Sequence, residues 1–214
     1  MARGRAPGYD EQRDTILARA AELFAQQGSS ATSMKQIAAA CGLSKATLYH
    51  YFRDKESMLA RIAEAHVLRL HAVLAEVDAL GGPPQARLRE LIARFVHEYA
   101  GAQHAHRVLT EDVKFLGNAE RERVLAIERE LVSGFAGVMV ELRPDLADAQ
   151  LAKPMTMLLF GMINWMFTWM RPDGPLNHAA LAPLVADLFL GGLPEVSLPT
   201  ATARRTENLA ETPT

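Results

Sequence analysis

The chain has 214 residues, enough for one medium-sized domain or for a small domain joined to a larger one. Hydrophobic residues make up 49% and charged residues 22% of the chain, which excludes a wholly disordered or fibrous protein and predicts a folded, soluble one. The single cysteine, Cys41, has no partner for an internal disulfide, and no N-terminal segment has the apolar core of a signal peptide. The most apolar run, Met155 to Met170, is shorter than a bilayer span and contains Asn164. We therefore expect a cytoplasmic protein with no membrane partner.

The net charge of -2 indicates no particular partner, but the charge is unevenly distributed. Residues 1–55 contain eight lysines and arginines against five acidic residues and carry +3, whereas the remaining residues carry -5. A mildly basic N-terminal segment on an acidic body is the distribution that contact with nucleic acid at one end requires.

Apolar residues recur at helical spacing along most of the chain and no strand-like alternation persists, which predicts an all-helical protein. In the N-terminal third we expect helices over 10–27, 34–41, 45–51 and 55–80. The residues that predict where the last three of these helices begin are the N-caps Ser33, Ser44 and Asp54, with Gln36 completing a capping box on Ser33. Glycines at 28, 42 and 81 predict where helices end.

Beyond the break at 81–84, a fifth apolar stripe runs from Leu88 to Tyr99 and a shorter one from Leu109 to Leu116. A long amphipathic helix is expected over 124–142, ended by a proline at 144. We expect one helix over 145–170 with a kink or break at Pro154, and a last helix that contains Leu181 to Phe189 and ends at the glycine pair 191–192.

The stretch from Ser33 to Phe52 predicts two short helices joined at Gly42, with the spacing of a helix-turn-helix. Gly42 can adopt the left-handed conformation that turns the chain, and Ala38 is small where the helices must pack closely. Apolar positions expected to hold these helices to the preceding one are Ile37, Cys41, Leu43, Leu48 and Tyr51. The third helix is left with outward donors and small apolar groups, which suit phosphates and base edges in a major groove: Lys45, Ala46, Thr47, Tyr49 and His50.

Within residues 10–60, the most specific elements are Ile16 to Phe24, Thr32-Ser33-Met34, Ile37-Ala38, Cys41-Gly42-Leu43-Ser44, Leu48-Tyr49, Tyr51-Phe52 and Asp54-Lys55-Glu56. In these elements the chain resembles the DNA-binding domain of the TetR family of transcriptional regulators. The resemblance implies an all-α protein of about nine helices, in which a three-helix helix-turn-helix domain (10–55) precedes a larger helical ligand-binding and dimerisation domain (56–192). A flexible arm (1–9) and a disordered tail (193–214) are expected at the ends.

The resemblance also implies the DNA contacts. Residues implied to meet phosphates or the sugar-phosphate backbone are Thr32, Ser33, Tyr49, His50 and Lys55, and those implied to face bases are Lys45, Ala46 and Thr47. For Tyr49 the alternative is a partly buried packing aromatic. Arg3 and Arg5 either reach an adjacent minor groove or belong to a solvated tail.

A regulator of this kind must bind an effector as well as DNA. The methionine-rich and aromatic segment from Phe160 to Met170 is the first candidate for the effector site. Two surfaces compete for it: a ligand cavity, and the contact that the last two helices of each subunit make in the TetR-family homodimer. The residues that we assign to a hydrophobic ligand are Met162, Trp165, Met166 and Trp169, with Phe95, Tyr99, Phe115, Phe135 and Met139 from facing helices.

The segment from Asn164 through Trp169 to Leu176 resembles the C-terminal region of TetR-type repressors that respond to acyl-CoA thioesters. The opening ten residues resemble regulators located beside aromatic-acid degradation genes, including the phenylacetate type. A CoA ligand would need cations for its phosphates, and the sequence candidates are Arg94, Arg107 and Lys114, each of which is alternatively a solvated charge on a helix face.

Other functions find less support. His97, His104 and His106 lie near acidic residues, but their spacing does not define a metal site and favours solvated or capping histidines. Cys41 is better explained by packing than by redox sensing. The common motifs of hydrolases, metalloproteases and nucleotide-binding enzymes are missing from the sequence, so a helical enzyme would need an unusual constellation. A module that binds only protein is a third possibility, weakened by the basic and polar side chains that the third helix turns one way.

The sequence therefore predicts a homodimeric, ligand-responsive repressor that binds a palindromic DNA operator and needs no metal or cofactor. Its expected effector is a small hydrophobic molecule of the acyl-CoA or aryl-CoA class. The alternative within the same class of protein is a repressor that responds to lipophilic drugs or free aromatic acids.

Overall fold

The computed structural model describes residues 8–170 and 174–198. Over these residues every regular element is a helix, as predicted, and no helix combines the length and apolar character needed to cross a membrane. Residues 1–7 of the predicted arm, with Arg3 and Arg5, residues 171–173 and residues 199–214 of the predicted tail lie outside the described residues. Tyr9, which the sequence assigned to the arm, is the first residue of α1.

Three helices form the head of the molecule: α1 (Tyr9–Gln27), α2 (Met34–Ala40) and α3 (Lys45–Tyr51). The predicted caps are confirmed, because Ser33 and Gln36 form a capping box at α2 and the Ser44 hydroxyl accepts a hydrogen bond from the Thr47 amide at 3.0 Å. Gly42 has a φ of 65°, the left-handed conformation that the turn between α2 and α3 requires. Ile37 and Leu48 are fully buried, so the two short helices are held by the apolar positions that the pattern indicated.

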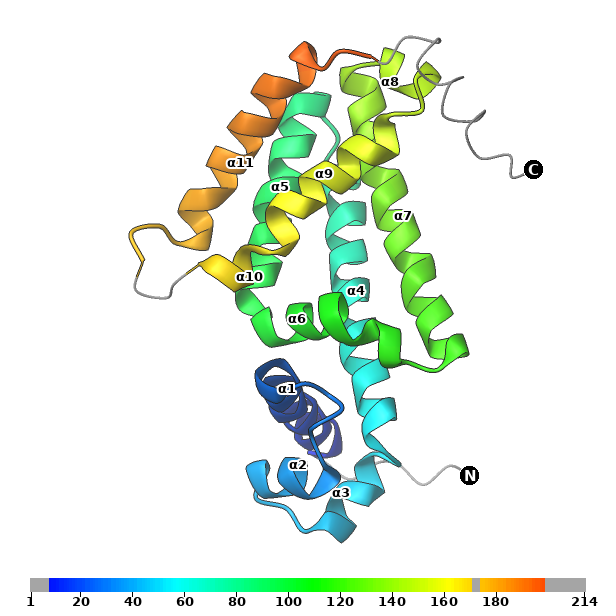
Figure 1. The fold of residues 1–214 in the computed structure, drawn as a ribbon, viewed down its shortest axis with the longest axis vertical. Coiled ribbons are helices and arrows are strands. Elements are labelled where there is room, and N and C mark those ends of the chain that lie inside the picture. Colours follow the sequence, from blue (N-terminus) through cyan, green and yellow to red (C-terminus); the bar gives the residue numbers. More distant parts are fainter. Residues whose placement is uncertain (1–7, 171–173, 199–214) are drawn as a thin grey trace, which may run out of the picture.

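The long helix α4 (Lys55–Leu80) starts in the head and runs through the body (Figure 1). Asp54 caps it by accepting a hydrogen bond from the Ser57 amide at 2.7 Å, and this bond lowers the pKa of the Asp54 carboxyl. In the body α4 packs against α7 (Asn118–Leu142), and the two helices approach closely at Gly134, where an added Cβ would lie 2.4 Å from Leu74 Cδ2. α4 is therefore the element that the two halves share.

The helix α6 (Gln103–Asp112) crosses the molecule between the head and the long body helices (Figure 1). It follows α5 (Pro84–Gly101), packs against both α1 and α4, and continues into the 3-10 turn η1 (Val113–Phe115). Its buried residues lie on one side of the helix, so α6 places one face against the body and the head at once.

The helix predicted over 145–170 is three helices: α8 (Asp145–Asp148), α9 (Ala152–Asn164) and α10 (Met166–Trp169). The prediction of one helix broken at Pro154 is wrong, because Pro154 lies in the first turn of α9, where its missing N–H costs no hydrogen bond. The chain breaks instead before α9, where Gln150 has a φ of 57°, and again at Trp165.

The last long helix, α11 (His178–Gly192), packs along α5, and the 3-10 turn η2 (Leu193–Glu195) follows it. Leu193, which the sequence assigned to the tail, is only 3% exposed, and its carbonyl accepts a hydrogen bond from the Arg143 guanidinium at 2.7 Å. The packed body therefore extends a few residues beyond the predicted boundary at 192.

Candidate functional site

The outer face of α3 presents the side chains that the sequence predicted there. Lys45, Ala46, Tyr49 and His50 are exposed, and Tyr49 at 47% exposure is not a packing aromatic. The Lys45 ammonium lies 5.7 Å from the centre of the Tyr49 ring, which favours a common orientation of the two side chains. Thr47 is half-buried and its hydroxyl lies 2.8 Å from that of Ser44. The helix thus offers a cation, a phenol, an imidazole and two methyl groups to one side.

Thr32 does not belong to this surface. Its side chain is 2% exposed, and its hydroxyl donates to the Gly28 carbonyl at 2.9 Å and accepts from the Gln27 amide at 3.0 Å. Burial and internal hydrogen bonds therefore occupy this hydroxyl, and the predicted contact of Thr32 with a phosphate stays a prediction. Ser33 is exposed, but its hydroxyl already serves the capping box of α2.

Lys55 has hydrogen-bond partners inside the head that the sequence did not predict. Its ammonium donates to the backbone carbonyls of Ser29, Ser30 and Thr32 at 2.7, 3.0 and 3.1 Å, which uses all three of its donors. These contacts fix the connection between α1 and α2 to the N-terminus of α4. Lys55 therefore stabilises the head from within, and its predicted contact with a phosphate stays a prediction.

A cavity of about 150 Å³ lies in the body and is lined by residues of five helices. Its lining residues are Leu70 of α4, Phe95 and Tyr99 of α5, His106, Leu109 and Thr110 of α6, Glu128, Leu131 and Val132 of α7, and Met157, Phe160 and Asn164 of α9. The wall is mostly apolar and aromatic with a few convergent polar groups, which is the usual composition of a small-molecule site.

Hydrogen bonds connect the polar groups of the cavity to one another and lead to His66 on α4. The Tyr99 hydroxyl donates to Asn164 Oδ1 at 2.9 Å, and the Tyr99 ring stacks on the His106 ring at 3.7 Å. His106 Nε2 lies 3.0 Å from the Asn164 carbonyl, which can only accept, so His106 carries its proton on Nε2. His106 Nδ1 then accepts from His66 Nε2 at 3.2 Å. Each hydrogen bond in this series therefore has a defined donor, and both imidazoles carry their proton on Nε2.

Burial keeps both histidines neutral. His66 and His106 are 4% and 2% exposed. Loss of hydration lowers the pKa of His66 to about 3, with a further contribution from His106, and lowers that of His106 to about 4. Burial also raises the pKa of Tyr99, helped by the nearby Glu128, and it raises the pKa of the Glu128 carboxyl. His106 is thus buried rather than solvated, and it donates to the carbonyl of Asn164, the last residue of α9, as the capping alternative predicted.

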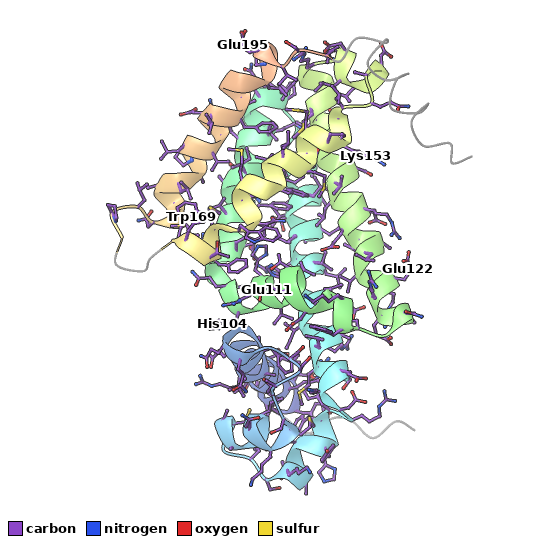
Figure 2. The ribbon with its side chains drawn as sticks, viewed as in Figure 1. His104, Glu111, Glu122, Lys153, Trp169 and Glu195 are labelled. Atoms are coloured by element: carbon purple, nitrogen blue, oxygen red, sulfur yellow. The ribbon has the colours of Figure 1, made fainter. Side chains whose placement is uncertain are left out.

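Of the predicted ligand residues, Phe95 and Tyr99 line the cavity. Phe135 and Met139 are fully buried behind the wall, where the Phe135 ring contacts those of Phe95 and Phe160 at 4.8 and 5.0 Å. The remaining predicted residues do not line it. Met166 is in the core at 1% exposure and Met162 is half-buried, while the exposed residues are Phe115 (51%), Trp165 (52%) and Trp169 (57%), the last on α10 at the edge of the body in Figure 2.

The three candidate cations differ in their availability. Arg94 is paired with Glu90 at 2.6 Å and Glu76 at 2.9 Å. Arg107 of α6 is exposed, is paired with Glu111 at 3.0 Å, and lies 5.7 Å from the Phe167 ring. Lys114 lies 5.2 Å from the ring of Phe115. No group of three or more potential metal ligands occurs among the described residues.

Sequence comparison agrees with this architecture. Residues 16–62 match the family described as bacterial regulatory proteins, tetR family, and residues 81–193 match the family described as tetracyclin repressor-like, C-terminal domain. Because the second match alone covers more than half of the chain, the chain belongs to the TetR family and is a DNA-binding transcriptional regulator with a helix-turn-helix head.

Three relatives illustrate the similarity. A TetR-family regulator from Bordetella parapertussis 12822 is 39% identical, with a TM-score of 0.81 over 86% of this chain and 97% of its own. The HTH-type transcriptional repressor KstR2 of Rhodococcus jostii RHA1 is 28% identical over 87% of this chain and 93% of its own. The structure of AibR in complex with isovaleryl coenzyme A and operator DNA is 26% identical, with a TM-score of 0.70 over 84% of this chain and 96% of its own.

Proposed function

We propose that this protein is a homodimeric repressor, released from a palindromic operator by a small acyl or aryl thioester whose acyl group occupies the body cavity. The observation that carries the proposal is the largely apolar and aromatic cavity of about 150 Å³ whose wall includes α4, the helix that also enters the head. A ligand there is in direct contact with the element that positions α3.

On DNA, the two α3 helices of a dimer would enter successive major grooves roughly one helical turn apart. Lys45, Ala46 and Thr47 would face base edges, and Tyr49 and His50 would contact the sugar-phosphate backbone. The exposure of Lys45, Ala46, Tyr49 and His50 supports this arrangement. The contacts assigned to Thr32 and Lys55 are left out, because both groups are used inside the head.

The dimer interface is proposed on α9 and α11. Large apolar side chains on these helices are exposed in the single chain: Met157, Leu158, Leu184 and Leu188, the last at 70%. An apolar surface of this kind on the last two long helices supports their burial against a second copy of the chain. Trp165, directly after α9, belongs to the same exposed group.

The thioester class is supported by AibR, whose structure holds isovaleryl coenzyme A and operator DNA. The cavity is too small for a whole CoA molecule and fits an acyl group, so the pantetheine arm and the phosphates would lie outside it. Arg107 and Lys114 are the cations available for those phosphates, because Arg94 already has two carboxylate partners. Ligand binding would favour a state whose heads are wrongly spaced for DNA.

One observation favours a second candidate effector. Glu128 places a carboxyl group in the cavity wall, and a lipophilic cation would neutralise it. A repressor that responds to cationic lipophilic compounds is therefore the alternative to one that responds to thioesters. Free aromatic acids lose support from the same residue.

The proposal is tested by measuring operator affinity at several salt concentrations with and without acyl-CoA ligands. We expect binding that weakens steeply with salt and a drop in affinity at saturating thioester. The double variant Lys45→Ala, Tyr49→Ala should lose specific binding while keeping its helical circular dichroism, whereas Lys153→Ala, on α9 far from the head in Figure 2, should bind normally. A flat salt response, or unchanged operator affinity at saturation with every thioester and every cation, would contradict the proposed function.

A further inference from the structure

Glu128 is unusual among the residues of the body cavity because it is the one acidic side chain in the described lining. It is half-buried on α7, in a wall otherwise made of apolar, aromatic and neutral polar groups. Over residues 8–170 and 174–198, no cation and no hydrogen-bond donor contacts its carboxyl group, and loss of hydration alone raises its pKa. Nothing within the described protein compensates this charge.

Asn164, on the neighbouring helix α9, supplies a complementary feature of the same lining. Its side-chain oxygen accepts from Tyr99, and its backbone carbonyl accepts from His106. The Asn164 amide nitrogen has no acceptor among the residues that the structure describes. The cavity therefore combines one unpaired acid with one unpaired neutral donor.

We infer that Glu128 makes this cavity selective for a neutral acyl carbonyl, such as that of a thioester, and excludes the free carboxylic acid from which the thioester is made. This inference rests on the proposed function and specifies which chemical form of the acyl group the site accepts. It assigns Glu128 the role of a specificity-determining residue.

Electrostatic repulsion favours the neutral thioester over the carboxylate. A carboxylate ligand would place a second negative charge in the same small, poorly hydrated space, and one of the two groups would have to bind a proton at a cost in free energy. A thioester carbonyl carries no net charge and can accept a hydrogen bond from the Asn164 amide. The regulator would thereby respond to the product of an acid-activating ligation reaction and ignore its substrate.

A charge series of ligands tests this inference. The isovaleryl and phenylacetyl groups are each presented as the CoA thioester, the primary amide, the carboxylate and the primary amine of the same chain length. Dissociation constants are measured calorimetrically for the wild-type protein and for Glu128→Gln. Glu130→Gln is the matched control, because Glu130 lies on the same helix but is 63% exposed and bonded to His71. Circular dichroism and thermal unfolding establish that each variant is folded.

We expect the wild-type protein to bind the amide at least about tenfold more tightly than the carboxylate. In Glu128→Gln this ratio should fall by about tenfold through tighter binding of the carboxylate, while thioester affinity changes by less than about threefold. Glu130→Gln should keep the wild-type ratio.

The contrary outcomes are distinct. If the thioester binds and releases the operator but the amide-to-carboxylate ratio is the same in Glu128→Gln, this inference is wrong and the proposed function stands. If the amine binds more tightly than the amide and loses its affinity in Glu128→Gln, the effector is a cation and the thioester reading is overturned. If no thioester and no amide of either series binds, the proposed effector class and this inference both fail.

Discussion

The buried histidine pair predicts a specific pH dependence of stability. His66 and His106 have pKa values of about 3 and 4 in the folded protein, against about 6.5 when exposed. A histidine whose folded-state pKa is lowered binds fewer protons in the folded than in the unfolded state. Its effect is therefore absent well above pH 6.5, and stability falls as the pH drops from there toward the folded-state pKa.

The magnitude follows from the unfolded state. At pH 5.5 the folded-state histidines are still neutral, whereas each unfolded-state histidine is one pH unit below its pKa and gains roughly RT ln 11 from protonation. For the two residues together, the free energy of unfolding should fall by about 3 kcal/mol between pH 7.5 and 5.5. Because pH 5.5 lies well above both folded-state values, the result does not depend on where in that low range they fall.

The assay compares the wild-type protein with the double variant His66→Gln, His106→Gln. Glutamine has an amide nitrogen near the position of histidine Nε2, the atom through which both residues donate, but it does not titrate. Urea unfolding at pH 7.5 and 5.5, at one protein concentration, gives four free energies. The wild-type protein should lose about 3 kcal/mol more than the variant. The raised pKa values of Asp112 and Glu128 act in both proteins and cancel.

Equal losses in the two proteins would refute this reasoning, because they would show that the histidines bind protons as readily in the folded state as in the unfolded one. Nitrogen-detected NMR gives an independent measurement. At pH 5.5 both imidazoles should be neutral with the proton on Nε2, as the carbonyl acceptor of His106 requires.

Three further predictions concern other contacts. Lys55→Met removes the ammonium that holds three backbone carbonyls of the α1–α2 connection, so urea unfolding should show a loss of about 1–3 kcal/mol and operator affinity should fall with it. Gly134→Ala places a methyl group against α4 and should cost about 1–3 kcal/mol. Gly137→Ala on the same helix meets nothing within 4 Å and should stabilise by up to about 1 kcal/mol, and equal effects of the two glycine variants would contradict the close approach. Leu188→Glu should convert the proposed dimer to monomers in analytical ultracentrifugation, whereas Leu80→Glu, equally exposed at the end of α4, should not.

Local features of the fold were predictable from the sequence because they depend on neighbours in the chain. The capping box at Ser33, the caps of α3 and α4 and the turn at Gly42 each involve residues within a few positions of one another. The family resemblance added the three-helix head. The break before α9 was misplaced because proline was taken to interrupt the helix, whereas it occupies a first turn that tolerates it.

The candidate site was less predictable because its contacts join residues far apart in the chain. Lys55 has a basic side chain at the start of a helix, which suits a phosphate, and only the folded head shows that loop carbonyls 23 to 26 positions earlier take its donors. His66 and His106 are separated by 40 positions. Glu128 lies on an amphipathic helix among other acids, and no local pattern separates a cavity carboxyl from a solvated one.

If the effector binds in the cavity as proposed, the placement of these groups along α4 gives a route from the cavity to the head. Lys55 holds the α1–α2 connection, and Leu70 forms part of the cavity wall. Between them, His66 is hydrogen-bonded to His106, which lines the cavity. At 1.5 Å per residue, Leu70 is roughly 22 Å from Lys55 along the helix axis. A tilt of α4 by about 5° at the cavity would then move its head end by roughly 2 Å. Because Lys55 ties the head to that end, α3 would move with it. In a dimer both heads would shift, which is enough to misplace hydrogen bonds whose length tolerance is a few tenths of an ångström.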